Sequence, residues 1–332
     1  MGNFPGRNTM KKQNFYYPSA DGATKIHSII WEPKGKPKAV LQIVHGMVEY
    51  IDRYDDFATF LTGKGFVVAG EDHLGHGESV INDSYHGYFG DKGNEYVIAD
   101  IHTLRQKLNE DYPGVPYFIL GHSMGSFLTR QYLTEDLGSY SLGISGAIIM
   151  GTGWQPEAVL AMGKAVAGSV AAIKGQRSPS KLVDGMAFGS YLKRIENPRT
   201  AKDWLTKDEA IVDKYVNDPW CTYDFSANGY IMMFTAMQKA QDINRIQTIN
   251  PQMPILFCAG AEDPVGNYGE AVRKAFQVYK DNTGCQVDIK IYEGDRHEIL
   301  NETDRAQVYE DMLTWMLESQ NQGDKNGLQG RI

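Results

Sequence analysis

The 332-residue sequence is short of cysteine, of positive charge and of long apolar runs. Its three cysteines, Cys221, Cys258 and Cys285, are too few and too scattered for a disulfide framework, so we expect a reducing, cytoplasmic environment. The formal net charge of −8 argues against a nucleic acid partner, because binding phosphate needs a basic face. No stretch reaches the roughly 18 apolar residues of a membrane span, and the N-terminus has no apolar core of signal-peptide length.

Short continuous apolar runs are present, and each ends in a glycine-rich turn. Runs of this kind, unlike alternating ones, predict parallel strands buried on both faces. They lie at 39–44, 66–70, 117–120, 146–150 and 255–260. The alternating segment 286–292 predicts a half-exposed strand near the sheet edge. Because helical patterns separate the runs, the sequence predicts an α/β fold with a mostly parallel central sheet flanked by helices.

The region 154–250 breaks this rhythm, since it has helical patterns but no clear buried strand. Its content of alanine, methionine and aromatic residues predicts a helical cap, or lid, over the strand ends. The remaining segments, 1–153 and 251–332, then form the α/β core. The alternative interpretation is a few extra helices on the surface.

The pentapeptide Gly-His-Ser-Met-Gly, residues 121–125, follows one of the predicted strands and precedes a helical pattern. A nucleophile elbow requires this context, because side chains two residues before and after the nucleophile would collide in so tight a turn. Gly121 and Gly125 remove that collision. Ser123 is therefore the expected catalytic nucleophile, and an ordinary glycine-rich turn is the alternative.

A serine hydroxyl needs a base within hydrogen-bond reach. His297 follows the last predicted strand, and Asp263 follows the strand before it. Carboxyl ends of parallel strands meet at one edge of a sheet, so we expect both side chains to converge on Ser123, with Asp263 orienting the imidazole. Glu262 and Asp295 are rival acids.

A tetrahedral intermediate also needs donors for its oxyanion. We expect these to be the backbone N–H groups of Met124, at the start of the helix after the elbow, and of Met47, in the turn after the first apolar run. A second feature, His73 and His76, resembles a metal pair but has no third ligand in the sequence. We therefore expect neither a metal nor a cofactor.

Four motifs in this order resemble the monoacylglycerol lipase and lysophospholipase branch of the α/β-hydrolases, which is grouped with serine aminopeptidases. They read HGMVEYIDRYDDFATFLTGKGFVVAGEDHLGHGES, GHSMGS, AGAEDPVG and GDRHEILNE, and the resemblance covers roughly 13–318. It implies Ser123 as nucleophile, Asp263 and His297 as its partners, and backbone donors at Met47 and Met124. The turn HGMVE differs from the HGGPG-type turn of proline aminopeptidases, which disfavours that activity.

The resemblance implies a serine hydrolase of single-acyl esters, such as monoacylglycerols or lysophospholipids, that works through an acyl-enzyme. The alternatives are an amide or peptide hydrolase or an acyltransferase with the same triad, and a binding module without activity. The partner expected is a small acyl ester. Apolar side chains in the predicted cap offer surface for an acyl channel, and the apolar stretch 156–173 offers contact with lipid aggregates.

Overall fold

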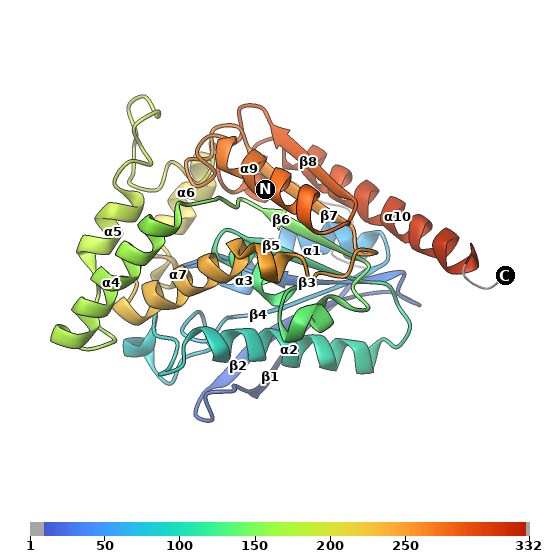
Figure 1. The fold of residues 1–332 in the computed structure, drawn as a ribbon, viewed down its shortest axis with the longest axis horizontal. Coiled ribbons are helices and arrows are strands. Elements are labelled where there is room, and N and C mark those ends of the chain that lie inside the picture. Colours follow the sequence, from blue (N-terminus) through green and yellow to red (C-terminus); the bar gives the residue numbers. More distant parts are fainter. Residues whose placement is uncertain (1–9, 330–332) are drawn as a thin grey trace.

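The computed structural model describes residues 10–329, with side chains described through residue 320. Its centre is an eight-stranded sheet in the order β1-β2-β4-β3-β5-β6-β7-β8 (Figure 1). The strands are β1 Met10–Pro18, β2 Lys25–Pro33, β3 Ala39–Val44, β4 Phe66–Glu71, β5 Tyr117–His122, β6 Gly146–Met150, β7 Ile255–Gly260 and β8 Val287–Tyr292.

The strands from β3 to β8 pair in parallel, and all six predicted strand positions are confirmed. β1 and β2 were not predicted from the sequence. They pair antiparallel with each other, and β2 joins the sheet beside β4. β1 is largely exposed and so lacks a continuous apolar run. The turn between them contains Asp21 and Gly22, and this dipeptide favours tight turns. It was the sequence signal that could have indicated the hairpin.

Helices cover both faces of the sheet, because neighbouring residues of each buried strand point to opposite sides. Leu41 and Ile43 of β3 pack with α1 (Asp55–Gly63) and α10 (Arg305–Gln329) in one apolar cluster. Val40 and Val44 of the same strand belong to the other cluster. The helices of that second face are α2 (Asn94–Asp111), α3 (Met124–Tyr132) and α9 (Glu270–Asn282).

The chain between β6 and β7 is helical and adds no strand to the sheet within its described residues. It forms α4 (Glu157–Lys174), α5 (Lys181–Phe188), α6 (Glu209–Val216), α7 (Ala227–Gln241) and α8 (Ile243–Ile246). Figure 1 shows α4 and α5 beyond one end of the strands, with α7 between them and the core. Short 3-10 helices lie at Ile51–Tyr54, Asp83–Tyr85, Asp136–Ser141, Pro219–Cys221 and Ile299–Asn301.

None of the helices in residues 10–329 is both long enough and apolar enough to span a membrane.

Arg130 of α3 is fully buried and links the core to the helices between β6 and β7. Its guanidinium donates to the Tyr279 hydroxyl at 3.1 Å and to the Gly153 carbonyl at 3.0 Å. A further hydrogen bond of 3.1 Å reaches the Ala240 carbonyl at the end of α7. Neutral oxygens of α9, of the loop after β6 and of α7 thus solvate one buried cation. Removing it leaves the Gly153 carbonyl without a donor, whereas the Ala240 carbonyl keeps the Tyr279 hydroxyl at 2.9 Å.

We expect Arg130→Met to destabilise the protein by roughly 3 kcal/mol, since the buried Gly153 carbonyl loses its donor and the Ala240 carbonyl and Tyr279 hydroxyl each lose one hydrogen bond. Urea unfolding followed by tryptophan fluorescence measures this. Arg273→Met, which removes an exposed arginine of α9, is the matched control and is expected to change the free energy of unfolding by less than about 0.5 kcal/mol. Equal stability of the two variants would contradict the linking role of Arg130.

Candidate active site

Ser123 lies at the turn between β5 and α3, with φ of 53° in the left-handed region. A β-carbon on Gly125 would come within 2.0 Å of the Val44 carbonyl oxygen of β3, and one on Gly121 within 2.4 Å of the Gly125 carbonyl oxygen. Neither position has room for a side chain. The two glycines therefore allow α3 to pack against the sheet closely enough to hold Ser123 in its strained conformation.

His297 and Asp263 meet at the same edge of the sheet, after β8 and β7. His297 Nδ1 lies 3.0 Å from Asp263 Oδ1, and both side chains are buried. The same carboxylate oxygen accepts the backbone N–H of Val265 at 2.9 Å. Donation of the Nδ1 proton to the carboxylate leaves Nε2 of His297 as the proton acceptor.

The two rival acids lie elsewhere. Glu262 is exposed and lies 3.8 Å from the Arg296 guanidinium. Asp295 is buried beside Lys207, 3.5 Å from its ammonium. Burial together with the charges of Glu302 and Asp304 raises the pKa of Asp295 to about 7. Of the three acids, Asp263 is the one that the structure brings to His297.

A largely apolar cavity of about 210 Å³ opens at this edge, and Ser123, His297, Met47 and Met124 all line it. The backbone N–H groups of Met47 and Met124 donate no hydrogen bond to any described residue. Unpaired N–H groups on a cavity wall are available to an oxygen of a bound ligand. The cavity thus joins a hydroxyl, an imidazole and two free amide donors.

The loop that carries Met47 is held by buried histidines. Val48, with φ of 54°, donates its N–H to His76 Nε2 at 3.2 Å, and His73 donates its N–H to His45 Nε2 at 3.0 Å. Burial lowers the pKa values of His45 and His76 well below their usual range, which keeps both rings neutral acceptors. His73 and His76 therefore shape this loop, and the described residues contain no group of three or more side chains that could hold a metal.

A buried ionic cluster at the wall of the cavity was not predicted from the sequence. The Glu49 carboxylate accepts hydrogen bonds from the Gly46 N–H, from His122 Nδ1 at 3.0 Å and from Arg53 at 2.7 Å. Arg53 also forms two hydrogen bonds with Glu298, at 2.7 and 2.9 Å. Glu49 and His122 lie inside the motifs HGMVE and GHSMG. Their closeness in sequence to Met47 and Ser123 was the signal that could have indicated a role near the site.

Electrostatics favours the charged forms of the groups in this cluster. Burial opposes ionisation of Glu49, but the hydrogen bond from His122 and the charge of Arg53 lower its pKa far below the usual range. Burial also disfavours the charged His122 ring, yet the hydrogen bond and charge of Glu49 outweigh it and raise the pKa of His122. The His122 ring lies 4.8 Å from that of His297, so the cluster packs directly under the imidazole.

The helical region between β6 and β7 also contributes to the cavity. The Trp204 ring lies 5.1 Å from the His297 ring, and the Leu205 carbonyl accepts the N–H of Glu298 at 2.7 Å. The Tyr215 hydroxyl donates to the Val48 carbonyl at 2.8 Å. These contacts connect chain segments with no shared sequence motif, so sequence patterns did not indicate them.

The sequence is similar to a known family and to known proteins over most of its length. The model of the family described as "Serine aminopeptidase, S33" matches residues 35–304. A monoglyceride lipase homolog from Monkeypox virus is 26% identical, covering 88% of this chain and 94% of its own. A monoacylglycerol lipase from Mycolicibacterium smegmatis is 25% identical, covering 89% and 94% of the two chains.

A solved structure is also similar over nearly the whole chain. The thermostable carboxyl esterase from Bacillus coagulans, determined in complex with glycerol, is 32% identical, with a TM-score of 0.85 and coverage of 93% of this chain and 99% of its own. The predicted resemblance and fold are confirmed. The chain is a serine hydrolase with the α/β-hydrolase fold, and it belongs to the serine aminopeptidase S33 family.

Proposed function

We propose that this protein hydrolyses monoacylglycerols or similar single-acyl esters, with Ser123 as nucleophile and His297 and Asp263 as its partners. The observation that carries the proposal is the 3.0 Å hydrogen bond between His297 and Asp263 at the wall of the apolar cavity that also contains Ser123. The monoglyceride lipase and monoacylglycerol lipase among the relatives support this substrate class.

In the proposed reaction, Ser123 Oγ attacks the ester carbonyl and its proton passes to His297 Nε2. The buried Asp263 carboxylate holds the imidazole in the required tautomer and stabilises the imidazolium. The N–H groups of Met47 and Met124 stabilise the oxyanion. His297 then returns the proton to the leaving alcohol, and water hydrolyses the acyl-enzyme by the reverse sequence of proton transfers.

The cavity favours an acyl chain over a peptide. Apolar side chains from three of the helices between β6 and β7 line it, namely Leu160, Val183, Met186, Met233, Phe234 and Met237. An aminopeptidase needs a carboxylate free to bind the substrate ammonium. The two acidic residues among the described lining, Glu49 and Glu298, are both paired with Arg53. An ester with an apolar chain therefore matches the cavity better than a peptide.

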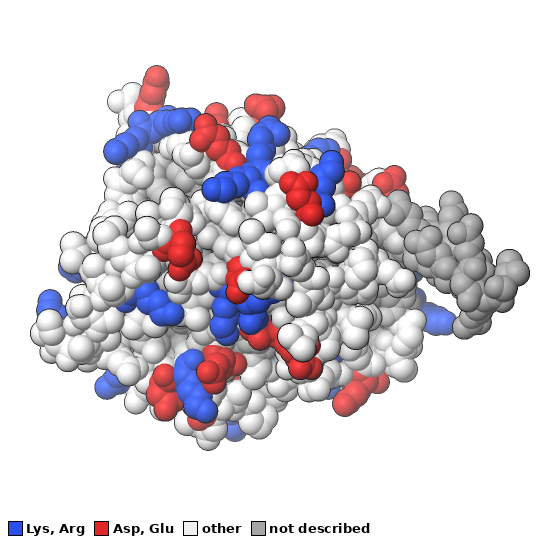
Figure 2. All heavy atoms as spheres, viewed as in Figure 1, with Lys and Arg blue, Asp and Glu red and all other residues white. Residues whose placement is uncertain are grey.

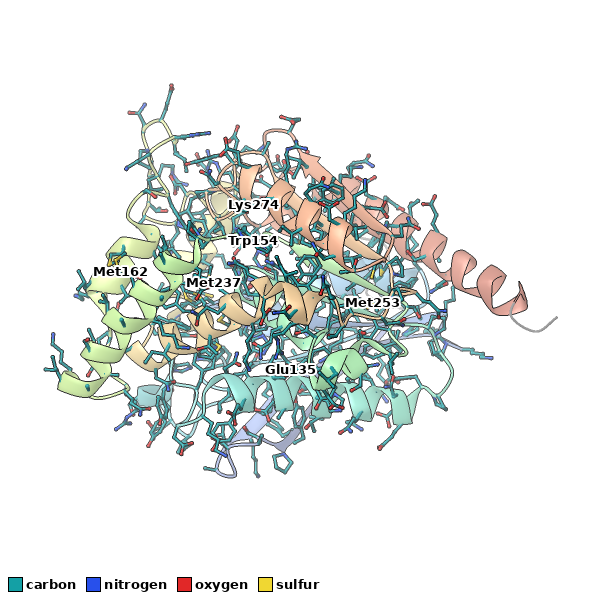
Figure 3. All side chains as sticks on the ribbon, viewed as in Figure 1. Glu135, Trp154, Met162, Met237, Met253 and Lys274 are labelled. Carbon is teal, nitrogen blue, oxygen red and sulfur yellow. The ribbon has the colours of Figure 1, made fainter. Side chains whose placement is uncertain are left out.

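We further propose that residues 154–250 act as a cap over the cavity and contact lipid aggregates. Apolar side chains of α4 and of the α5 region are exposed on the outer side: Met162 by 52%, Ile173 by 82% and Leu182 by 62%. Figure 3 shows Met162 on α4 at the outer edge, whereas Met237 of α7 lies nearer to the sheet. In Figure 2 charged residues are sparse over this end of the molecule. Such a surface suits contact with lipid.

A fluorophosphonate probe tests the nucleophile. We expect the wild type to be labelled and Ser123→Ala to lose both labelling and ester hydrolysis, the latter by roughly 10⁴-fold or more, because Ser123 is the one serine, threonine or cysteine among the described residues that line the cavity. Ser169→Ala, on the exposed side of α4, is the control that should retain both. Labelling of folded Ser123→Ala would show that another residue is the nucleophile.

The role of the acid is tested by Asp263→Asn with Glu262→Gln as its neighbour control. The amide donates where the carboxylate accepts, so the imidazole loses its required tautomer, and we expect kcat for a p-nitrophenyl ester to fall by roughly 10⁴-fold. Glu262→Gln should stay within about twofold of the wild type. The reverse ranking of the two variants would assign the acid to Glu262.

Contact of the cap with lipid is tested with Met162→Gln, Ile173→Gln and Leu182→Gln combined. We expect about a tenfold loss of hydrolysis of an emulsified monoacylglycerol, because apolar area that enters the lipid surface contributes roughly 25 cal/mol per Å². Hydrolysis of a soluble short-chain ester should change by less than about twofold. Leu142→Gln, which replaces another exposed leucine, serves as control. An equal loss on both substrates would argue against lipid contact.

A further inference from the structure

The interior of α4 contains a buried glycine that lines the cavity. Leu160, Gly163 and Ala167 are the buried residues of this helix, and they share one face, which packs along α7. Glycine in the interior of a helix is less stable than alanine, because it loses more conformational freedom on folding. Gly163 nevertheless lies in the middle of that face and in the wall of the cavity. The absence of a side chain at this position therefore needs a structural reason.

The Phe234 ring of α7 occupies the space that a side chain at position 163 would need. A β-carbon on Gly163 would lie 2.8 Å from Cζ and 2.9 Å from Cε2 of Phe234, much closer than two carbon atoms normally approach. The edge of the ring thus packs directly on the backbone of α4. Since Phe234 and Gly163 both line the cavity, this contact forms part of the cavity wall.

A second contact restrains the same ring. Tyr230, one turn earlier on α7, stacks on Phe234 with the two ring centres 6.2 Å apart. Tyr230 is fully buried, and its hydroxyl donates to the Asp184 carboxylate of α5 at 2.9 Å. Phe234 therefore contacts both the backbone of α4 and a ring that is anchored to α5.

The restrained ring differs from the methionine side chains that share its cavity. Met186, Met233 and Met237 line the same space. A methionine side chain has three rotatable bonds and adapts to the shape of its neighbours, so it can move aside for a bound chain. Of these four side chains, the Phe234 ring is the one that resists displacement.

The volume of the cavity limits the length of the chain that it can hold. An apolar cavity of about 150 Å³ in another protein binds one benzene molecule, which corresponds to roughly 25 Å³ for each carbon atom. At that value, the cavity of about 210 Å³ holds a chain of about eight carbons. Each buried methylene strengthens binding about fourfold, whereas a methylene that stays in water adds nothing.

We infer that Phe234, packed on the backbone at Gly163, is a specificity-determining residue that limits the acyl site to medium chains of about eight carbons. The inference rests on the proposed function and deepens it, because it names the length of the acyl group. A side chain at position 163 takes volume from the cavity, either directly or by displacing the ring, and shortens the preferred chain. A smaller side chain at position 234 adds volume and lengthens it.

The test measures kcat/KM for p-nitrophenyl hexanoate, octanoate and decanoate below the concentrations at which they aggregate. For the wild type we expect a rise of roughly tenfold from hexanoate to octanoate and of less than about twofold from octanoate to decanoate. Phe234→Ala should raise the decanoate-to-octanoate ratio by about tenfold, because the space of the removed ring accepts two further methylenes. Phe234→Leu, a milder change that keeps the wall apolar, should raise that ratio by about fourfold.

Gly163→Ala tests the same contact from the opposite helix. The added methyl group takes about one carbon's volume from the cavity, so we expect the octanoate-to-hexanoate ratio to fall by about fourfold. Gly168→Ala is the matched control on the same helix, since a β-carbon there meets nothing within 4 Å and the residue lies outside the cavity lining. It should leave both ratios unchanged.

A wild type whose kcat/KM rises as steeply from octanoate to decanoate as from hexanoate to octanoate overturns this inference and leaves the proposed function standing. So does an unchanged ratio in folded Phe234→Leu or in folded Gly163→Ala. Failure to hydrolyse any of the three esters, in wild-type protein with a native thermal unfolding transition, overturns the proposed function itself.

Discussion

The buried guanidinium of Arg53 fixes the loops of the site relative to one another. Arg53 pairs with Glu49, which follows β3, and with Glu298, which follows the imidazole at His297. Through Glu49 the pairing extends to the Gly46 N–H and to His122, the neighbour of Ser123. Burying these charges is costly, and it is tolerated because each finds a partner of opposite sign. A shift of any one loop would leave a charge buried and unpaired.

The elbow depends on a second constraint, which is steric rather than electrostatic. The backbone of α3 at Gly125 approaches the Val44 carbonyl so closely that only glycine fits. This contact fixes the height of Ser123 above the sheet, while the ionic cluster fixes the loop and the imidazole around it. Arg130 of the same helix then joins the core to the helices between β6 and β7.

The sheet and the helical region between β6 and β7 contribute different residues to the cavity. The sheet edge supplies the proposed reacting groups, since the carboxyl ends of parallel strands converge there. The chain between β6 and β7 supplies apolar lining from α4, α5 and α7. It also supplies Lys202 and Trp204 from the segment before α6 and Tyr215 from α6. The proposed reacting groups and most of the apolar lining thus come from different segments, and Trp204 and Tyr215 connect the two through the His297 ring and the Val48 carbonyl.

The sequence by itself determined the parallel strands and the residues placed at their ends, because buried strands read as continuous apolar runs and the Ser123 turn requires glycines on both sides. It did not reveal the β1–β2 hairpin, since an exposed edge strand lacks such a run. Only the tertiary structure decided which acid meets His297, how Arg53 joins Glu49 to Glu298, and that Lys202 faces the cavity. These are long-range pairings of single side chains, which arise from packing and leave no periodic pattern in the sequence.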